Sequence, residues 1–153
     1  MRQNFEIFIR QMCPEDAAAA AEIERSSFSS PWSVQGFLDA LDNPNTWCIA
    51  AFSDVLAGYC ILYLAADEAE IATIAVAGPY RGSGIADAML TYIKEQMPKR
   101  GIGRILLDVR PSNRAARALY EKHGFQTDGR RKNFYSDPRE DAVLMSFDKG
   151  NIC

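Results

Sequence analysis

A short glycine-rich segment between a strand and a helix constrains the fold of this chain more than any other part of the sequence. Residues 74–76 are apolar and predict a buried strand, residues 78–84 predict a turn and a loop, and an amphipathic helix follows. Gly82 and Gly84 can adopt backbone conformations that direct several N–H groups toward one point, beside the positive end of the helix dipole. This arrangement predicts a loop that binds phosphate groups.

Two common phosphate-binding motifs do not match this loop. A Walker loop requires Gly-Lys-Ser/Thr, whereas Gly84 is followed by Ile85 and Ala86. A dinucleotide fingerprint requires a third glycine where Asp87 stands, and no acidic residue follows the next strand at the required offset. The second glycine pair, Gly101-Ile102-Gly103, precedes a strand and indicates a helix-to-strand turn. By its residues alone, the loop from Gly82 fits either another phosphate-bearing ligand or a plain tight turn.

Composition restricts the class of protein. A length of 153 residues with 48% hydrophobic residues predicts one domain, residues 1–153, with enough chain to bury a core. The formal net charge of −3 and the absence of a basic run longer than residues 129–132 predict no direct nucleic-acid binding.

No window approaches the ~18 apolar residues of a membrane span, and no signal peptide is recognisable, so we expect a cytoplasmic protein without membrane contact. The four cysteines have no metal-binding spacing, which predicts no metal site, and Cys48 and Cys60 are expected to be buried in strands.

Alternation and helical periodicity predict seven strands and four helices. The strands are expected at residues 4–10, 46–52, 57–65, 68–76, 104–109, 126–131 and 142–147, and the helices at residues 14–25, 34–41, 84–99 and 113–122. Ser33 and Asn113 are predicted N-caps, and Gly124 is a predicted left-handed helix stop. This order implies an α+β or mixed α/β fold whose central βαβ unit surrounds the glycine loop.

Five separated blocks, the glycine loop among them, carry a family resemblance. Arg81-Gly82-Ser83-Gly84-Ile85-Ala86 resembles the Arg/Gln-x-x-Gly-x-Gly/Ala motif of the GNAT superfamily of N-acetyltransferases. The other blocks resemble its RimI-type branch; they are Phe28-Ser29-Ser30-Pro31-Trp32-Ser33, Asp108-Val109-Arg110-Pro111-Ser112-Asn113, Ala118-Leu119-Tyr120-Glu121-Lys122-His123-Gly124-Phe125 and Arg139-Glu140-Asp141-Ala142. The similarity runs from about Ile23 to Phe147.

The resemblance implies a fold and an activity. The expected fold is the GNAT fold, with a mostly antiparallel seven-stranded sheet, a splayed central parallel pair and about four helices. RimI-type enzymes acetylate the N-terminal alanine of a small-subunit ribosomal protein. The resemblance therefore implies acetyl-coenzyme A as co-substrate and the N-terminal peptide of a protein, such as a ribosomal protein, as acceptor. It implies no oligomeric state.

The resemblance also implies the residues that hold acetyl-coenzyme A across a V-shaped opening in the sheet. Backbone groups of Ile74, Ala75 and Val76 are expected to bond the pantetheine arm and to polarise the thioester carbonyl. The pyrophosphate is expected at the amides of Gly82, Ser83, Gly84, Ile85, Ala86 and Asp87, with Arg81 opening the loop and Asn113 as a further contact. Because a carboxylate repels phosphate, we expect the Asp87 side chain to face away and only its N–H to contribute.

Acetyl transfer to an amine requires a base for the ammonium proton and an acid for the thiolate. The resemblance implies that Tyr120 is the acid, although the residues alone also fit a core tyrosine. Asp108 stands where RimI-type enzymes have their glutamate base, twelve residues before the tyrosine, and its side chain is one methylene shorter. Glu70 is the alternative base, since Glu70-Ile71-Ala72-Thr73-Ile74 resembles the strand in which other superfamily members keep theirs. Glu70 also fits a solvent-exposed carboxylate on an edge strand; we favour Asp108 and leave both open.

The acceptor is expected to contact Phe28, Trp32, Tyr135 and the edges of the split sheet. Trp32 fits a hydrophobic plug under the first two helices equally well, and His123 is expected to cap a helix C-terminus. Two other functions stay open. One is acetylation of a lysine side chain or a small-molecule amine, and the other is a coenzyme A-binding or partner-binding module without activity. The aspartate at position 108 favours the inactive module, whereas the presence of Tyr120 argues against it.

Overall fold

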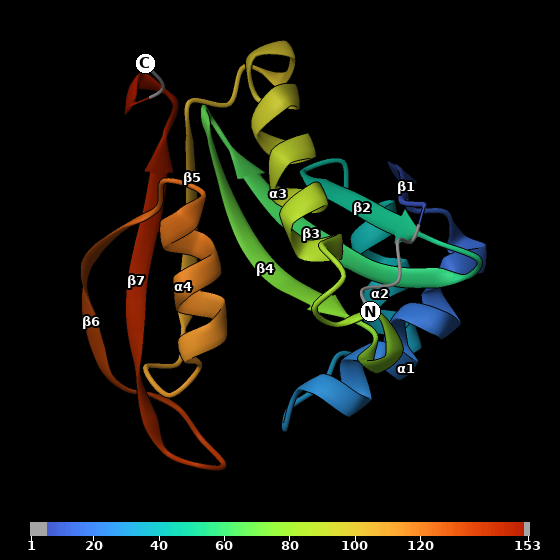
Figure 1. Cartoon of the computed structure of the whole chain (residues 1–153), viewed down its shortest axis with the longest axis horizontal. Helices are drawn as coiled ribbons and strands as arrows, with labels where there is room; N and C mark the ends of the chain where they lie inside the picture. The colour runs from blue at the N-terminus through green and yellow to red at the C-terminus, as the bar shows by residue number, and fades with distance from the viewer. Residues whose placement is uncertain (1–5, 152–153) are drawn as a thin grey trace.

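The computed structural model describes residues 6–151 and contains one seven-stranded sheet with helices on both faces (Figure 1). The strands are β1 (Phe8–Gln11), β2 (Thr46–Phe52), β3 (Leu56–Ala65), β4 (Glu68–Val76), β5 (Arg104–Val109), β6 (Gln126–Tyr135) and β7 (Glu140–Asp148). The α-helices are α1 (Ala17–Ser27), α2 (Val34–Asp42), α3 (Ile85–Gln96) and α4 (Arg114–Lys122). The strand order is β1-β2-β3-β4-β5-β7-β6, and only β4 and β5 pair in parallel. The predicted mixed α/β GNAT fold is thus confirmed.

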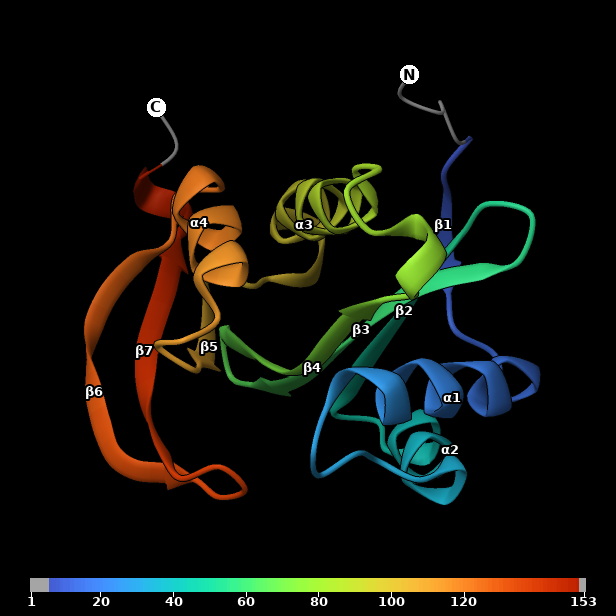
Figure 2. The same cartoon turned by 60° about the horizontal axis from the view of Figure 1, so that its bottom comes forward.

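The sheet has a hydrophobic core on each face, and β2 contributes to both because successive side chains point to opposite sides. Trp47 and Ile49 pack in the core that contains the buried face of α3. Cys48 and Ala50 pack in the second core, which α1 and α2 cover. Figure 2 shows α3 and α4 above the sheet and α1 and α2 below it. As predicted, Cys48 is a buried hydrophobe in a central strand.

The predicted helix caps are present. The Ser33 hydroxyl accepts a hydrogen bond of 3.1 Å from the Gly36 N–H at the start of α2. The Asn113 side chain accepts one of 3.2 Å from the Ala116 N–H at the start of α4. Gly124, directly after α4, has the predicted left-handed conformation with φ of 89°.

Some element boundaries differ from the prediction. The strand expected at residues 4–10 is observed at Phe8–Gln11, and residues 4–5 lie outside the described part. The helix expected from residue 14 begins with a 3-10 turn, Pro14–Asp16, that leads directly into α1, and the Asp16 carboxylate accepts from the Cys13 N–H at 2.8 Å. Strand β6 continues to Tyr135, beyond the predicted end at residue 131. It is an exposed, polar edge strand, so its sequence lacks the apolar alternation that marks a half-buried one.

The parallel pair β4 and β5 is joined over a short stretch only. Glu68, Ala69 and Glu70 of β4 face residues 104–106 of β5, and beyond that point the two strands diverge. Strand β4 also contains a bulge at Ala72, since the residues on either side of it pair with consecutive residues of β3. The divergence opens the sheet at its centre and creates the cleft described below.

The helices formed by residues 6–151 include none with the length and apolar character needed to cross a membrane.

Candidate active site

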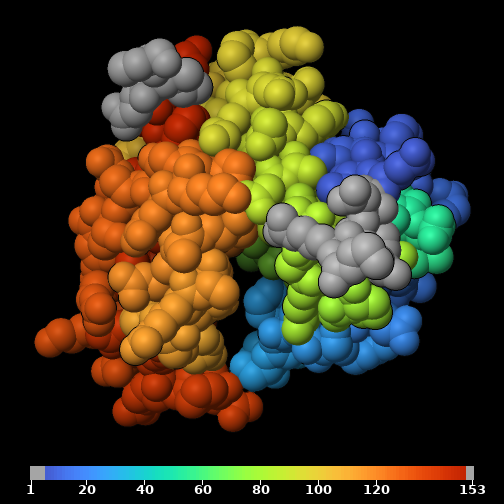
Figure 3. All heavy atoms as spheres, viewed as in Figure 1, coloured from blue at the N-terminus to red at the C-terminus, as the bar shows by residue number. Residues whose placement is uncertain are grey.

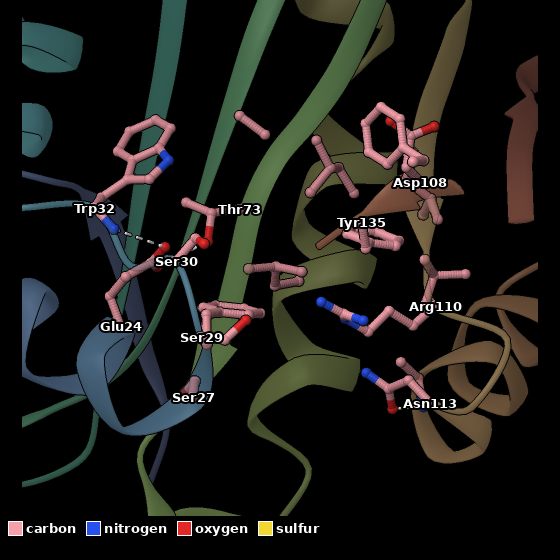
Figure 4. Close-up of a pocket in the computed structure, with 18 of the residues that line it drawn as sticks. Glu24, Ser27, Ser29, Ser30, Trp32, Thr73, Asp108, Arg110, Asn113 and Tyr135 are labelled. Atoms are coloured by element: carbon pink, nitrogen blue, oxygen red, sulfur yellow. Dashed lines mark hydrogen bonds between the residues drawn. The ribbon is translucent and has the colours of Figure 1, made fainter. Parts of the chain in front are cut away.

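A cleft with a volume of about 510 Å³ lies where β4 and β5 separate. One wall consists of the end of α1, the segment after it and β4, and the other of the end of β5, α4 and the β6–β7 hairpin. Figure 3 shows the hollow between α4 and the segments facing it, and Figure 4 shows the side chains that line it. In the part of the chain that the structure describes, no three His, Cys, Asp or Glu side chains are arranged to hold a metal ion.

Most residues expected to contact the thioester or the acceptor line this cleft, together with the expected base Asp108 and the expected coenzyme A contact Asn113. They come from the segment after α1, from β4 and β5, and from α4 and the hairpin; they are Phe28, Trp32, Ile74, Asp108, Asn113, Tyr120 and Tyr135. Glu70 is not among the lining residues: it lies in the paired part of β4, opposite Leu106, and its side chain is exposed. Because β4 is a central strand, the interpretation of Glu70 as an edge-strand residue is wrong.

Tyr120 is both a core residue and a cleft residue. Its side chain is 6% exposed, and its ring packs 5.5 Å from that of Phe125. Burial raises the pKa of Tyr120 well above its ordinary value, with a smaller contribution from Cys60. The hydroxyl is therefore protonated at neutral pH and can donate a proton or a hydrogen bond into the cleft.

Trp32 likewise combines the two roles that its sequence context suggested. Its ring lies 5.3 Å from that of Phe37, a fully buried residue of α2, which is the packing expected of a hydrophobic plug. The same residue lines the cleft, so the plug forms part of the acceptor wall.

On the opposite wall, Asp108 and Tyr135 are electrostatic neighbours. Burial, followed by the negative charge of Asp108, raises the pKa of Tyr135 to about 12. The Arg110 guanidinium lies 4.4 Å from the centre of the Tyr135 ring. It also donates to the carbonyl oxygens of Ser136 at 3.1 Å and Pro138 at 2.9 Å. Arg110 therefore fixes the hairpin that carries Tyr135 against the end of β5.

Glu140 ties the same hairpin to the loop that leads into α4. Its carboxylate accepts hydrogen bonds from the Ser112 N–H at 2.8 Å, from the Ser112 hydroxyl at 2.9 Å and from Arg110 at 3.3 Å. Loss of hydration raises the pKa of Glu140, but the bonds from Ser112 and Arg110 outweigh it and leave the pKa below its ordinary value. Glu140 belongs to the family block Arg139-Glu140-Asp141-Ala142, and the resemblance implied no role for it.

The glycine loop has the geometry of an anion site. Gly82 and Gly84 have φ of 76° and 90°, conformations that other residues rarely adopt. The amides of residues 82 and 84–87 donate to no acceptor among the described residues. A Cβ added at Gly82 or Gly84 would meet no heavy atom within 4 Å. The loop thus presents unpaired donors to open space at the N-terminus of α3, and these donors fit a pyrophosphate.

Arg81 and Asp87 hold this loop in place through their side chains. Arg81 donates to the Val76 carbonyl oxygen at 3.1 Å and to the Ser27 hydroxyl at 3.3 Å. The Asp87 carboxylate lies 2.9 Å from both Lys122 Nζ and His123 Nε2, which links α3 to α4. The hydrogen bond from Lys122 is the main cause of the lowered pKa of Asp87, and the bond with His123 adds to it. His123 is the C-cap residue of α4, as predicted.

Glu24 is a further cleft residue, which no sequence motif identified; it lines the cleft although its side chain is almost completely buried. Glu24 follows Ala17, Ala20 and Ala21 at the three- and four-residue spacing of one helix face, and all of these residues are buried. A carboxylate on an otherwise apolar stripe is the signal that could have identified it.

The chain was compared with known proteins and structures. The family model "Acetyltransferase (GNAT) family" matches residues 17–125. The chain is 39% identical to a Bacillus subtilis (strain 168) protein over 90% of this chain and 92% of that protein, and 35% identical to one from Escherichia coli (strain K12) over 86% and 90%. The E. coli protein is named as a ribosomal protein bS18-alanine N-acetyltransferase, and the B. subtilis protein bears that name provisionally. The crystal structure of the ribosomal-protein-S18-alanine N-acetyltransferase from E. coli matches with a TM-score of 0.86 and 32% identity over 94% of each chain.

Proposed function

The chain belongs to the GNAT acetyltransferase family, and we propose that it transfers the acetyl group of acetyl-coenzyme A to the α-amino group of a protein N-terminus, with the N-terminal alanine of ribosomal protein bS18 as acceptor. The observation that carries this proposal is the cleft between β4 and β5, which Asp108 and Tyr120 line together and whose lining residue Ser27 is bonded to Arg81 of the glycine loop. We further propose that residues 1–153 form one acetyltransferase domain. A ribosomal-protein acceptor would place the enzyme in the cytoplasm.

In this proposal the loop and β4 hold acetyl-coenzyme A, which supplies the acetyl group as a thioester. The unpaired amides of residues 82 and 84–87 bind the pyrophosphate. Backbone groups of Ile74, Ala75 and Val76 bond the pantetheine arm on the side of β4 that no longer pairs with β5. Asn113 contacts the cofactor from the start of α4, and its side chain also caps the helix.

The proposed chemistry needs only one proton acceptor and one proton donor. An α-amino group has a pKa of about 7.7–8.0, so roughly a tenth to a fifth of it is neutral at pH 7 and a carboxylate acting through water suffices as base. Asp108 takes the ammonium proton, the amine nitrogen bonds to the carbonyl carbon, and the carbon–sulfur bond breaks. Tyr120 then donates its proton to the departing thiolate, and the attacking nitrogen releases its second proton as the amide forms; through water, this proton restores the hydroxyl of Tyr120. The transfer is direct, within a ternary complex.

The test is a peptide panel with acetyl-coenzyme A. Peptides that begin with alanine, serine or methionine are compared with a peptide whose α-amine is blocked and whose only amine is an internal lysine. Thiol release is measured, and mass spectrometry locates the acetyl group. We expect acetylation of the α-amine of the alanine peptide.

Two other outcomes would change the proposal. Acetylation of the lysine peptide alone would show that the enzyme acts on side-chain amines. Turnover of none of the peptides, with coenzyme A still bound, would indicate a coenzyme A-binding module. The occurrence of an aspartate at position 108, where RimI-type enzymes have a glutamate, is the feature that makes this second outcome worth testing.

A further inference from the structure

Glu24 is a buried carboxylate with no cationic partner in the part of the chain that the structure describes. Its side chain is 2% exposed, on the face of α1 that packs against the sheet. Among residues 6–151, no lysine, arginine or histidine side chain forms an ion pair with it. Removing a charge from water costs several kcal/mol unless partners compensate for it. The position therefore needs either strong hydrogen bonds or a cation that is not part of the described chain.

The hydrogen bonds that Glu24 accepts replace the lost hydration of mainly one of its two carboxylate oxygens. Oε2 accepts from the hydroxyls of Tyr59 and of Thr73, the latter at 2.8 Å. Burial and then the bond to Glu24 raise the pKa of Tyr59, so its hydroxyl stays protonated and acts as the donor. Within the described part of the chain, Oε1 accepts only from the Trp32 N–H, at 3.4 Å. Since each carboxylate oxygen has about two acceptor positions, Oε1 has capacity left for a further donor.

The remaining acceptor capacity of Glu24 lies where the acceptor amine must enter. Glu24 and Thr73 line the same cleft as Asp108, and Figure 4 shows them on the opposite side of it. Thr73 directly follows Ala72, the bulged residue of β4 at the point where the strands diverge. A cation held at Oε1 would therefore sit between the split strands, on the side facing Asp108.

We propose that Oε1 of Glu24 binds the α-ammonium group of the acceptor peptide and so selects acceptors with a free N-terminal amine. This inference rests on the proposed function, because it assumes a peptide N-terminus in the cleft. Glu24 takes no proton in this scheme: it holds the ammonium group by a charge-assisted hydrogen bond, while Asp108 accepts the proton before the amine attacks. One carboxylate serves for binding and the other for proton transfer.

The experiment compares two peptides in the presence of coenzyme A, which fills the cofactor site without allowing acetyl transfer. One is a peptide with N-terminal alanine, and the other is the same peptide with a propionyl group in place of alanine, so that only the amine is missing. The ratio of their dissociation constants isolates the contribution of the amine. We expect wild-type protein to bind the amine peptide about 10- to 100-fold more tightly, the range for a hydrogen bond between charged groups.

The Glu24→Gln variant should bring this ratio to within about threefold of unity, since the amide keeps the size of the side chain but removes its charge. The matched control is Glu22→Gln, which removes an exposed carboxylate two residues away on the same helix and should leave the ratio unchanged. A purely structural role of Glu24 would weaken the binding of both peptides equally, so an unchanged ratio in Glu24→Gln overturns the inference. If Glu24→Gln does not fold, Glu24→Asp takes its place, because it withdraws the carboxylate by one methylene. This variant must also lower the ratio of the two dissociation constants. An undiminished ratio in Glu24→Asp overturns the inference.

Failure of the inference differs from failure of the proposed function. If wild-type protein acetylates the alanine peptide but Glu24→Gln retains the full ratio, only the role of Glu24 is wrong. If wild-type protein neither binds nor acetylates the peptides, the proposed function fails and this inference fails with it.

Discussion

Arg110 and Tyr135 form a stacked pair at the mouth of the cleft, with the guanidinium carbon 4.4 Å from the centre of the ring. The same guanidinium reaches two carbonyl oxygens of the β6–β7 hairpin and the carboxylate of Glu140. Arg110, directly after β5, thus helps to hold the hairpin and Tyr135 in place beside Asp108. This contact connects strands that are far apart in the sequence.

Replacement of Arg110 by lysine should impair acceptor binding selectively. Lysine keeps the charge but cannot stack on Tyr135 and bridge two carbonyls at once. We expect kcat/KM for the acceptor peptide to fall about tenfold while the KM for acetyl-coenzyme A stays within about twofold, because a cation–π contact with its hydrogen bonds contributes on the order of 1–2 kcal/mol. Steady-state kinetics with each substrate varied in turn gives both values. The control is Arg139→Lys, an exposed residue of the same hairpin; an equal loss in both variants would contradict this role of Arg110.

The two candidate bases can be separated by a matched pair of carboxamide variants. Asp108→Asn should lower turnover about 100-fold or more and shift the pH–rate profile upward, because only amine that is already neutral in solution could then react. Glu70→Gln should leave both quantities unchanged, since Glu70 lies outside the cleft lining. The measurement is kcat as a function of pH for both variants. The opposite pattern would assign the base to Glu70.

Tyr120→Phe should reduce turnover without unfolding the protein. The phenyl ring retains the packing against Phe125, while the proton donor is lost. We expect kcat to fall about 100-fold near pH 7 and the deficit to shrink above about pH 8.5, where a thiolate leaves without needing a proton. Thermal unfolding checks the fold, and Tyr92→Phe, a partly buried tyrosine of α3, is the control. A deficit independent of pH would argue against Tyr120 as the acid.

Gly84→Ala should weaken acetyl-coenzyme A binding through the backbone. An alanine at φ of 90° is strained by about 1–2 kcal/mol, and relieving that strain turns the loop amides away from the pyrophosphate. We expect the KM for acetyl-coenzyme A to rise about tenfold with little change in the KM for the peptide. Gly129→Ala is the matched control, because a Cβ there also meets nothing within 4 Å and the residue has no positive φ. Equal effects of the two variants would show that the conformation of Gly84 is unimportant.

Because Asp87 contacts Lys122 and His123, the free energy of unfolding should depend on pH in the acidic range. The pKa of Asp87 is lowered in the folded protein, so its stabilising effect is fully present above the unfolded pKa of about 3.8 and is lost as the pH falls through the lower folded pKa. Asp87→Asn should therefore lower the Tm at pH 7, and the difference from wild type should shrink as the pH falls below 3.8. Added salt should also reduce this difference, because the carboxylate is partly exposed. A difference in Tm that stays constant from pH 7 to pH 3 would rule out a role of the Asp87 charge in stability.

Much of the fold could be predicted because local rules act on neighbouring residues. The range of β4 and the caps at Ser33 and Asn113 follow from alternation and side-chain chemistry within a few residues. The extension of β6 to Tyr135 could not be predicted, since pairing with β7 and not side-chain burial forms that part of the strand.

The sequence by itself determined the glycine loop, the order of elements and the resemblance to acetyltransferases, because each is written in adjacent residues. Only the tertiary structure decided which carboxylates meet at the cleft. It brings Glu24 of α1 and Asp108 of β5 to opposite sides of one opening and leaves Glu70, two residues before the bulge of β4, outside it. The physical reason is that β4 and β5 pair through Glu70 and separate immediately afterwards, a divergence that depends on contacts between distant strands.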